Sequence, residues 1–385
     1  MSEREVTIVA AVRTPLGHHK GPTQYVRADE MLAVVLREAV ARAGVDPGLV
    51  EDVIVGCANP IREQASNVGR VAALMAGLPQ HVPGATVQRQ CGSAETALHF
   101  GCQAILSGDM SVVLVGGVES MSRVPMGSAR AETSWHPWLS ERYEMISQGM
   151  AAERIAARWG LSRTELDAFS LESHRRAVAA RERGDFRAET VPVQVTLADG
   201  SSRLIEEDDG PRADTSPEKM AALRPAFVEG GVVTAGNSSQ MSNGAAAVLL
   251  VEKRRAEELG LRPRARVVAR AVVGDDPTLM LLGPIPATRR ILAKTGYRLD
   301  QMDAVEVNEA FASVVLAWAR EVGADPEKTN PRGGAIALGH PTGCTGVRMT
   351  VTLLHELEQT GGRLGLQTMC HGGGTATATM LERID

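Results

Sequence analysis

Four side chains that could carry out acyl chemistry stand at turns that follow predicted strands. They are Cys91, Asn308, His340 and Cys370. A histidine can make a cysteine thiol nucleophilic, and a second cysteine can exchange a proton with a thiolate of similar pKa. The amide of an asparagine can hold a water or a carbonyl oxygen. Together these groups predict acyl transfer between thiols and carbon.

Cys91 lies in the run Gln90-Cys91-Gly92-Ser93-Ala94, where a short strand leads into a predicted helix over residues 92–106. Free backbone N–H groups and the helix dipole favour the thiolate form of a cysteine at such a helix start. Without that context, a single cysteine is more often a buried and inert residue. Asn308 also stands between a strand and a helix, where capping is the structural alternative to a catalytic role.

Two glycine-rich runs carry the other two reactive side chains. His340 stands between a glycine and a proline within Gly333–Gly346, which reads GGAIALGHPTGCTG and is too rich in small residues to pack a core by itself. Cys370 opens the run CHGGG, whose turn can aim backbone N–H groups at a developing oxyanion. That run is similar to the oxyanion loop of lipases, but the sequence has no G-x-S-x-G nucleophile elbow.

The composition narrows the class of protein. A net charge of −5 and an aromatic content of 3% argue against binding of nucleic acid or of an anionic membrane surface. The five cysteines are widely spaced and include no C-x-x-C pair, which is typical of a reduced cytoplasmic protein without a zinc framework. We find no signal peptide and no apolar run long enough to span a membrane. We therefore expect a cytoplasmic protein with no metal, no nucleic-acid partner and no membrane anchor.

Predicted strands and helices alternate along most of the chain, which indicates a layered α/β fold. Between Glu119 and about Gly230, apolar strands are scarce and charged helices dominate, so this region reads as a mostly helical insertion. The element order also repeats. Gly44 and Gly296 are 252 residues apart, Gly108 and Gly361 are 253 apart, and each glycine separates a predicted helix from a strand. These two nearly equal spacings indicate two similar halves whose loops meet over one site. The alternative is a chance match of common patterns.

Five ordered motifs make the chain resemble the thiolase family over nearly its full length. They are the Cys91 segment, Gly117–Ser122, Asn308–Phe311, Gly333–Gly346 and Cys370–Gly374. Within the family, the sequence of residues 308–320 and 339–346 is similar to that of actinobacterial 3-ketoacyl-CoA thiolases, including the steroid side-chain type. The resemblance implies a five-layer αβαβα sandwich of two βαβαβαββ halves with an inserted loop domain.

The resemblance also implies how the chain is divided. Residues 1–118 and about 231–262 would form the N-terminal half, 119–230 the loop domain on the coenzyme A side, and 263–385 the C-terminal half. Thiolases pair through their first-half sheets, so a homodimer or homotetramer is implied. The stretch 121–143, rich in Trp, Met and Arg, would be either the loop that joins dimers or a surface loop.

The family's catalytic roles carry over to matching positions. Cys91 corresponds to the acylated nucleophile, His340 to the histidine that activates it, and Cys370 to the acid/base cysteine. Asn308, through a water, would form one oxyanion hole with His340. The backbone N–H groups of Cys91 and Gly372 would form the other.

Coenzyme A is implied as a substrate and not as a permanently bound cofactor. Ser239 matches a serine that contacts the pantetheine, and Arg212 matches a basic residue near the adenine nucleotide. Met280 and Phe311 match wall residues of the acyl pocket. The chain departs from the family pattern at four positions without losing a catalytic group: Ala94, Ser147, Arg332 and Ala376. The changes at Ala94 and Ser147 bear on acyl-chain specificity.

The resulting hypothesis is a thiolase that works by a ping-pong mechanism. It would cleave a 3-ketoacyl-CoA with coenzyme A, or condense two acyl-CoAs in the reverse direction. One alternative is a ketosynthase-like condensing enzyme fed by a carrier protein, although such enzymes usually pair their cysteine with two histidines and this chain has Asn308 at the second position. The other is a non-catalytic acyl-CoA or lipid-binding protein, which we would expect to have lost catalytic groups.

Overall fold

The computed structural model describes residues 4–130 and 133–384. Residues 131 and 132, within the predicted 121–143 loop, lie outside the described residues. No helix in the described ranges is long and apolar enough to cross a membrane.

Four strands form the first half of a large sheet, in the order β3 (Asp52–Gly56), β5 (Val112–Ser120), β8 (Ser242–Glu252) and β1 (Val6–Arg13). β3 and β5 are parallel, and the other pairs are antiparallel. The short β4 (Ala85–Val87) pairs with the outer edge of β3. β5 and β8 are buried along their whole length, which explains why their sequences are nearly continuous runs of apolar and small residues.

The second half of the sheet repeats this pattern. Its strands lie in the order β10 (Ala304–Val307), β11 (Leu364–His371), β12 (Thr375–Arg383) and β9 (Ala265–Gly274). β10 and β11 are parallel and the remaining pairs antiparallel, as in the first half. β1 and β9 join the halves through only two residue pairs, Thr7 with Arg266 and Ile8 with Ala265. The duplication predicted from the glycine spacing is therefore confirmed by the strand topology.

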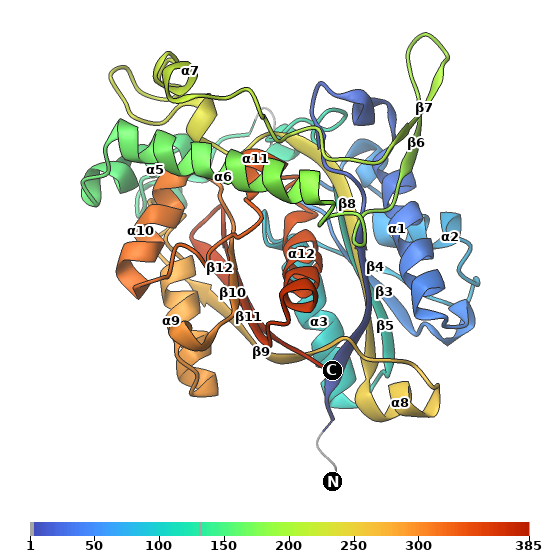
Figure 1. The fold of residues 1–385 in the computed structure, drawn as a ribbon. Coiled ribbons are helices and arrows are strands. Elements are labelled where there is room, and N and C mark those ends of the chain that lie inside the picture. The colour runs from blue at the N-terminus through green and yellow to red at the C-terminus, as the bar shows by residue number, and fades with distance from the viewer. Residues whose placement is uncertain (1–3, 131–132, 385) are drawn as a thin grey trace.

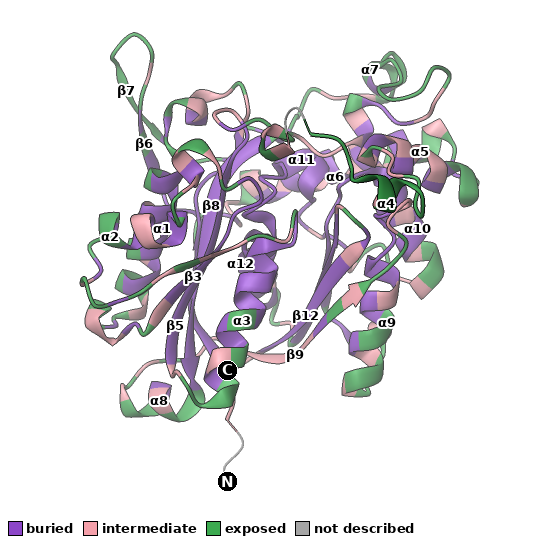
Figure 2. Ribbon diagram, turned by 180° about the vertical axis from the view of Figure 1, so that it is seen from behind, coloured by how far each residue is buried: buried purple, intermediate pink, exposed green. Residues whose placement is uncertain are grey.

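Helices complete five layers (Figure 1). The helices α3 (Ser93–Ser107) and α12 (Thr345–Thr360) lie between the two halves of the sheet and contact each other. The outer face of the first half is covered by α1 (Ala28–Ala43) and α2 (Val68–Met75). The outer face of the second half is covered by α9 (Pro284–Thr295), and α10 (Ala312–Val322) packs beside α9 and against α5 and α6. Figure 2 shows α12 and the central strands as almost wholly buried, as the αβαβα sandwich requires.

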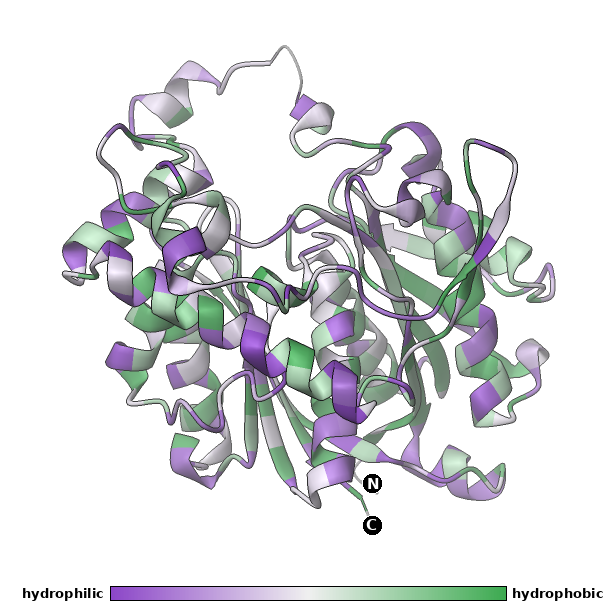
Figure 3. Cartoon of the chain, turned by 45° about the horizontal axis from the view of Figure 1, so that its top comes forward, coloured by the Kyte–Doolittle hydropathy of each residue, from purple (hydrophilic) through white to green (hydrophobic). Residues whose placement is uncertain are grey.

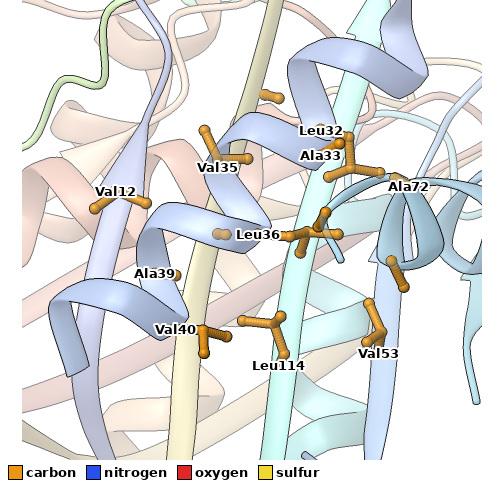
Figure 4. Close-up of a cluster of buried hydrophobic side chains, with 14 of the residues drawn as sticks. Val12, Leu32, Ala33, Val35, Leu36, Ala39, Val40, Val53, Ala72 and Leu114 are labelled. Atoms are coloured by element: carbon orange, nitrogen blue, oxygen red, sulfur yellow. The ribbon is translucent and has the colours of Figure 1, made fainter. Parts of the chain in front are cut away.

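Apolar spacing explains how α1 packs. Leu32, Val35, Leu36, Ala39 and Val40 recur at helical intervals and are buried against the sheet. Figure 4 shows these side chains directed at the strands beneath them. Burying one such leucine contributes about 2 kcal/mol to folding. Gly44 ends the helix, as predicted, and it does so in a left-handed conformation with φ at 66°.

The segment between β5 and β8 is mostly helical and crosses one end of the sandwich. It contains α4 (Pro137–Ser140), α5 (Gln148–Arg158), α6 (Arg163–Arg183) and α7 (Pro217–Ala221). It also contains a hairpin that the sequence did not reveal, β6 (Val193–Thr196) with β7 (Ser202–Ile205). In Figure 3 the helices of this end carry hydrophilic stretches, whereas the central strands are hydrophobic. Among the described residues, the remaining short strand and α-helices are β2 (Gly17–His18), α8 (Lys253–Glu258) and α11 (Ala335–Leu338).

Candidate active site

Cys91 stands immediately before α3 and lines a cavity of about 690 Å³. It is 7% exposed, and its sulfur faces the backbone N–H groups of Gly372 and of Cys91 itself. Burial raises the pKa of the Cys91 thiol to about 11, although the two N–H groups favour the thiolate. The thiol is therefore protonated at neutral pH and needs a base before it can attack a carbonyl carbon.

His340 has the protonation state that such a base needs. Thr345 Oγ1 donates to the carbonyl of Pro341 at 2.9 Å, so it accepts a hydrogen bond from Nδ1 of His340 at 2.7 Å. This assigns the proton to Nδ1 and leaves Nε2 unprotonated. Burial lowers the pKa of His340 to about 3, so the ring is neutral at physiological pH.

Asn308 lies beside the same nitrogen. Its Nδ2 is 3.4 Å from Nε2 of His340, and both side chains are buried. The backbone N–H of Asn308 donates to Thr368 at the end of β11, which ties the residue to the second half of the sheet. Asn308 therefore offers one donor nitrogen beside Nε2 of His340, and Nε2 becomes a second donor to an oxyanion once it has taken a proton.

Cys370 comes from the other side, near the end of β11. It is buried, and its neighbours Gly373 and Gly374 form the turn into β12 with φ values of 88° and 74°, which favour glycine. Burial raises the pKa of Cys370, and the proximity of Cys91 raises it further. The two sulfurs therefore share one buried site, although they are far apart in the sequence.

A buried carboxylate connects the loops around this site. The sequence alone assigned it no role. Glu119, in β5, accepts hydrogen bonds from the N–H groups of Ala58 (2.8 Å) and Gly343 (2.9 Å), and from Gln64 Nε2 (2.7 Å). Thr342 Oγ1 donates to it at 3.2 Å. A carboxylate inside the apolar run of β5 was the signal that could have revealed it, because such a charge must be satisfied by donors.

The residues predicted to contact coenzyme A lie on the side of the inserted segment. Arg212 is exposed and lines a cavity of about 170 Å³ together with Lys219 and Gln240. The carbonyl of Gln240, which lines this cavity, accepts the backbone N–H of His340 at 3.0 Å. Ser239 is partly buried next to Gln240, and its N–H donates to Ala310.

The two predicted wall residues of the acyl pocket differ in position. Phe311 lines the 690 Å³ cavity with Cys91, and so does Ser147, one of the departures from the family pattern. Met280 is buried in the same hydrophobic cluster as Phe311, but it is not among the described residues that line the cavity. The structure thus places Cys370 and Gly372 next to Cys91, and Asn308 next to His340, whereas Met280 does not line the cavity.

A duplicated αβαβα sandwich with two cysteines and a neutral histidine at the junction of its halves defines a class of cysteine-dependent acyltransferases. Residues 6–254 match the thiolase N-terminal domain, and residues 261–383 match the thiolase C-terminal domain. The chain therefore belongs to the thiolase family.

Several relatives are similar over all or nearly all of their length. The steroid 3-ketoacyl-CoA thiolase FadA6 of Mycobacterium tuberculosis is 47% identical, over 99% of this chain and 94% of the relative. The beta-ketoadipyl-CoA thiolase of Pseudomonas aeruginosa is 43% identical, over 99% and 100%. The solved structure of the Bacillus anthracis acetyl-CoA acetyltransferase superposes with a TM-score of 0.92 at 39% identity, over 99% of each chain. The predicted thiolase function and acyltransferase class are confirmed, and neither alternative is favoured.

Proposed function

We propose that this thiolase carries its acyl group on Cys91 and uses His340 and Cys370 as its two proton-transfer groups. In the degradative direction, Nε2 of His340 takes the proton of Cys91, and the thiolate attacks the 3-keto carbon of an acyl-CoA. The bond between C2 and C3 breaks, and its electron pair leaves with acetyl-CoA, or another short acyl-CoA, as an enolate. The thiol of Cys370 protonates C2 of that enolate.

The second half-reaction returns the protein to its starting state. The Cys370 thiolate takes the proton of the incoming coenzyme A thiol, whose sulfur attacks the thioester on Cys91. The shortened acyl-CoA leaves, and Cys91 recovers its proton from His340. Every step is reversible, so the same groups serve Claisen condensation when the concentrations of acyl-CoAs favour it.

The observation that carries this proposal is the position of the Cys91 sulfur against two backbone N–H groups. The neutral form of His340 supports its role as the base. Donors in that position stabilise the oxyanion of a thioester carbonyl attacked at Cys91. Asn308 and His340 would hold the carbonyl oxygen of the departing enolate. The two half-reactions would therefore use two separate oxyanion holes.

Coenzyme A would bind as a substrate along the segment between β5 and β8. The exposed cations Arg212 and Lys219 and the partly buried Ser239 support this position, because the nucleotide end of coenzyme A is anionic. We propose residues 119–230 as the coenzyme A domain, between halves formed by 1–118 with 231–262 and by 263–385. We also propose a homodimer or homotetramer, in which the exposed Trp138 of the 121–143 stretch would be covered.

Turnover of the Cys91→Ala variant tests the catalytic assignment. We expect loss of thiolysis with every 3-ketoacyl-CoA, while coenzyme A still binds. Turnover near the wild-type rate would remove Cys91 from its role. A series of substrates from acetoacetyl-CoA to bulky ring-bearing acyl-CoAs, suggested by the relative named as a steroid 3-ketoacyl-CoA thiolase, would then identify the acyl group.

A further inference from the structure

A second buried polar cluster lies directly behind Cys91, and the mechanism above does not use it. Its centre is Glu95, on the first turn of α3, which is fully buried. Glu95 accepts hydrogen bonds from the hydroxyl groups of Thr377 and Thr379 on β12, each at 2.6 Å. A buried carboxylate that binds two threonines of the other half of the sheet fixes the position of α3 relative to β12.

The hydroxyl oxygen of each threonine also makes a hydrogen bond with a histidine. Thr377 Oγ1 is 3.0 Å from Nε2 of His371, and Thr379 Oγ1 is 2.9 Å from Nε2 of His99. Because both hydroxyl protons point at Glu95, the threonine oxygens accept, and each histidine carries its proton on Nε2. Nδ1 of His371 then accepts from the hydroxyl of Thr375 at 3.1 Å.

The two branches end in different places. The His99 branch ends within α3. His371 lies between Cys370 and Gly372, and its ring also touches Gly92: a Cβ at residue 92 would lie only 2.0 Å from Nε2 of His371. His371 therefore contacts the peptide that follows Cys91 and is itself followed by Gly372, so one ring fixes the spacing of the two N–H donors that face the Cys91 sulfur.

We propose that Glu95, acting through Thr377 and His371, is a positioning residue that sets the separation of the Cys91 and Gly372 N–H groups in the oxyanion hole. The proposal rests on the acyl-Cys91 mechanism and goes beyond it, because none of these three side chains touches the substrate. Its structural requirement is that Glu95 accepts both hydroxyl hydrogen bonds. The ionised carboxylate does this best, because a protonated carboxyl group accepts more weakly and brings an O–H that needs an acceptor of its own.

The charge state of Glu95 is therefore linked to the geometry of the hole. Burial raises the pKa of Glu95 to about 7, and the hydroxyls of Thr377 and Thr379 partly offset that effect. The other groups around it are His99 in the middle of α3, Arg89 shortly before α3, Gln367 and His371 of β11, and Arg270 of β9. The guanidinium of Arg270 donates to the carbonyl of His99. Burial lowers the pKa of His371 to about 3, so this histidine stays neutral while Glu95 titrates. A protonated Glu95 must donate to one threonine, which reverses the hydrogen bonds along that branch.

Two threonine variants separate the branches. Thr377→Val and Thr379→Val make the same chemical change two residues apart on one strand, and each removes one hydroxyl from Glu95. We expect Thr377→Val to lower kcat about tenfold or more, with KM changed less than about twofold, because an oxyanion hole acts on the transition state. Thr379→Val should keep kcat within about threefold of wild type, and Thr377→Ser, which restores the hydroxyl, should recover most of the loss.

The pH profile provides the second measurement, and it does not depend on Thr377→Val folding well. Wild-type kcat should fall as the pH decreases through about 7, and Glu95→Gln, which cannot titrate, should lose that limb. Equal losses in Thr377→Val and Thr379→Val, or a Glu95→Gln variant that keeps the wild-type limb, would overturn the proposal. Persistence of the limb would point instead to another buried carboxylate such as Glu306, whose pKa burial also raises to about 7.

Rapid quenching of the wild-type protein with acetoacetyl-CoA distinguishes this inference from the proposed function. An acyl group on Cys91 in the wild type, together with equal losses in the two threonine variants, would refute only the role of Glu95. The absence of any acyl group on Cys91 would refute both.

Discussion

Replacing Glu119 by Gln tests whether the loops around the site are held by a charged clamp. Gln64 Nε2 and the side-chain and backbone nitrogens of Asn59 donate to one oxygen of Glu119, while Ala58, Thr342 and Gly343 donate to the other. Burial raises the pKa of Glu119, yet every neighbour is a donor, so the carboxylate is ionised at neutral pH. A glutamine amide must turn its NH₂ group towards donors on one side, whichever way it is oriented.

These contacts determine how much the substitution lowers the free energy of unfolding. If the amide oxygen stays with Ala58 and Gly343, the 2.7 Å bond from Gln64 is lost and becomes a contact between donors. Gln64 cannot turn over to compensate, because its own Oε1 accepts from the N–H of Ser120 at 2.7 Å. Losing a charge-assisted hydrogen bond and leaving a buried donor unpaired costs about 2–4 kcal/mol. For a chain of 385 residues this lowers Tm by about 3–5 °C.

Differential scanning fluorimetry and steady-state kinetics measure the two effects. We expect the lower Tm together with a kcat reduced about tenfold, because Thr342 and Gly343 lie two and three residues after His340 and a 1 Å displacement of a base is costly. Glu207→Gln is the matched control, since Glu207 is exposed and the same loss of charge should leave both values unchanged. A Glu119→Gln variant with wild-type Tm and kcat would refute the idea that this carboxylate clamps the loop.

Three further predictions follow from individual contacts. Thr345→Val removes the acceptor for Nδ1 of His340, so the tautomer that can act as a base is less populated, and kcat should fall about tenfold with little change in KM. Thr352→Val in the same helix is the control. Equal kcat values in the two variants would contradict the role of Thr345. Arg212→Ala should raise KM for coenzyme A severalfold, leave kcat unchanged and make KM less sensitive to salt. Arg203→Ala, on the exposed hairpin, should leave KM for coenzyme A unchanged. Equal KM values in the two variants would remove Arg212 from the coenzyme A site. Gly92→Ala places a Cβ against the His371 ring and should reduce kcat at least about a hundredfold while the circular dichroism spectrum stays native, so a fully active variant would show that the contact is not needed.

Local patterns predicted much of the fold. The apolar runs of β1, β5 and β8 and the glycine-terminated helix α1 could be placed from the sequence, because each depends on neighbouring residues alone. The spacing of equivalent glycines revealed the duplication for the same reason. β12 was not anticipated, because its alternation of threonine and alanine lacks the large apolar side chains that mark a buried strand. The hairpin of β6 and β7 was missed because it stands among charged helices and is largely exposed.

Some residues of the candidate site could be predicted from local sequence patterns, and others could not. Cys91, His340 and Cys370 could be singled out because each is a reactive side chain in an unusual local setting. The carboxylates of Glu119 and Glu95 could not be given roles, because their partners lie far away in the chain: Glu95 and Thr379 are 284 residues apart. Such hydrogen bonds exist only after the two halves have packed together.

The measurement that tests the central claim most directly is peptide-mapped mass spectrometry after a brief exposure to 3-ketoacyl-CoA without free coenzyme A. We predict one acyl adduct, on the peptide that contains Cys91, and its disappearance when coenzyme A is added. An adduct on Cys370 or elsewhere, or turnover without any adduct on Cys91, would contradict the account.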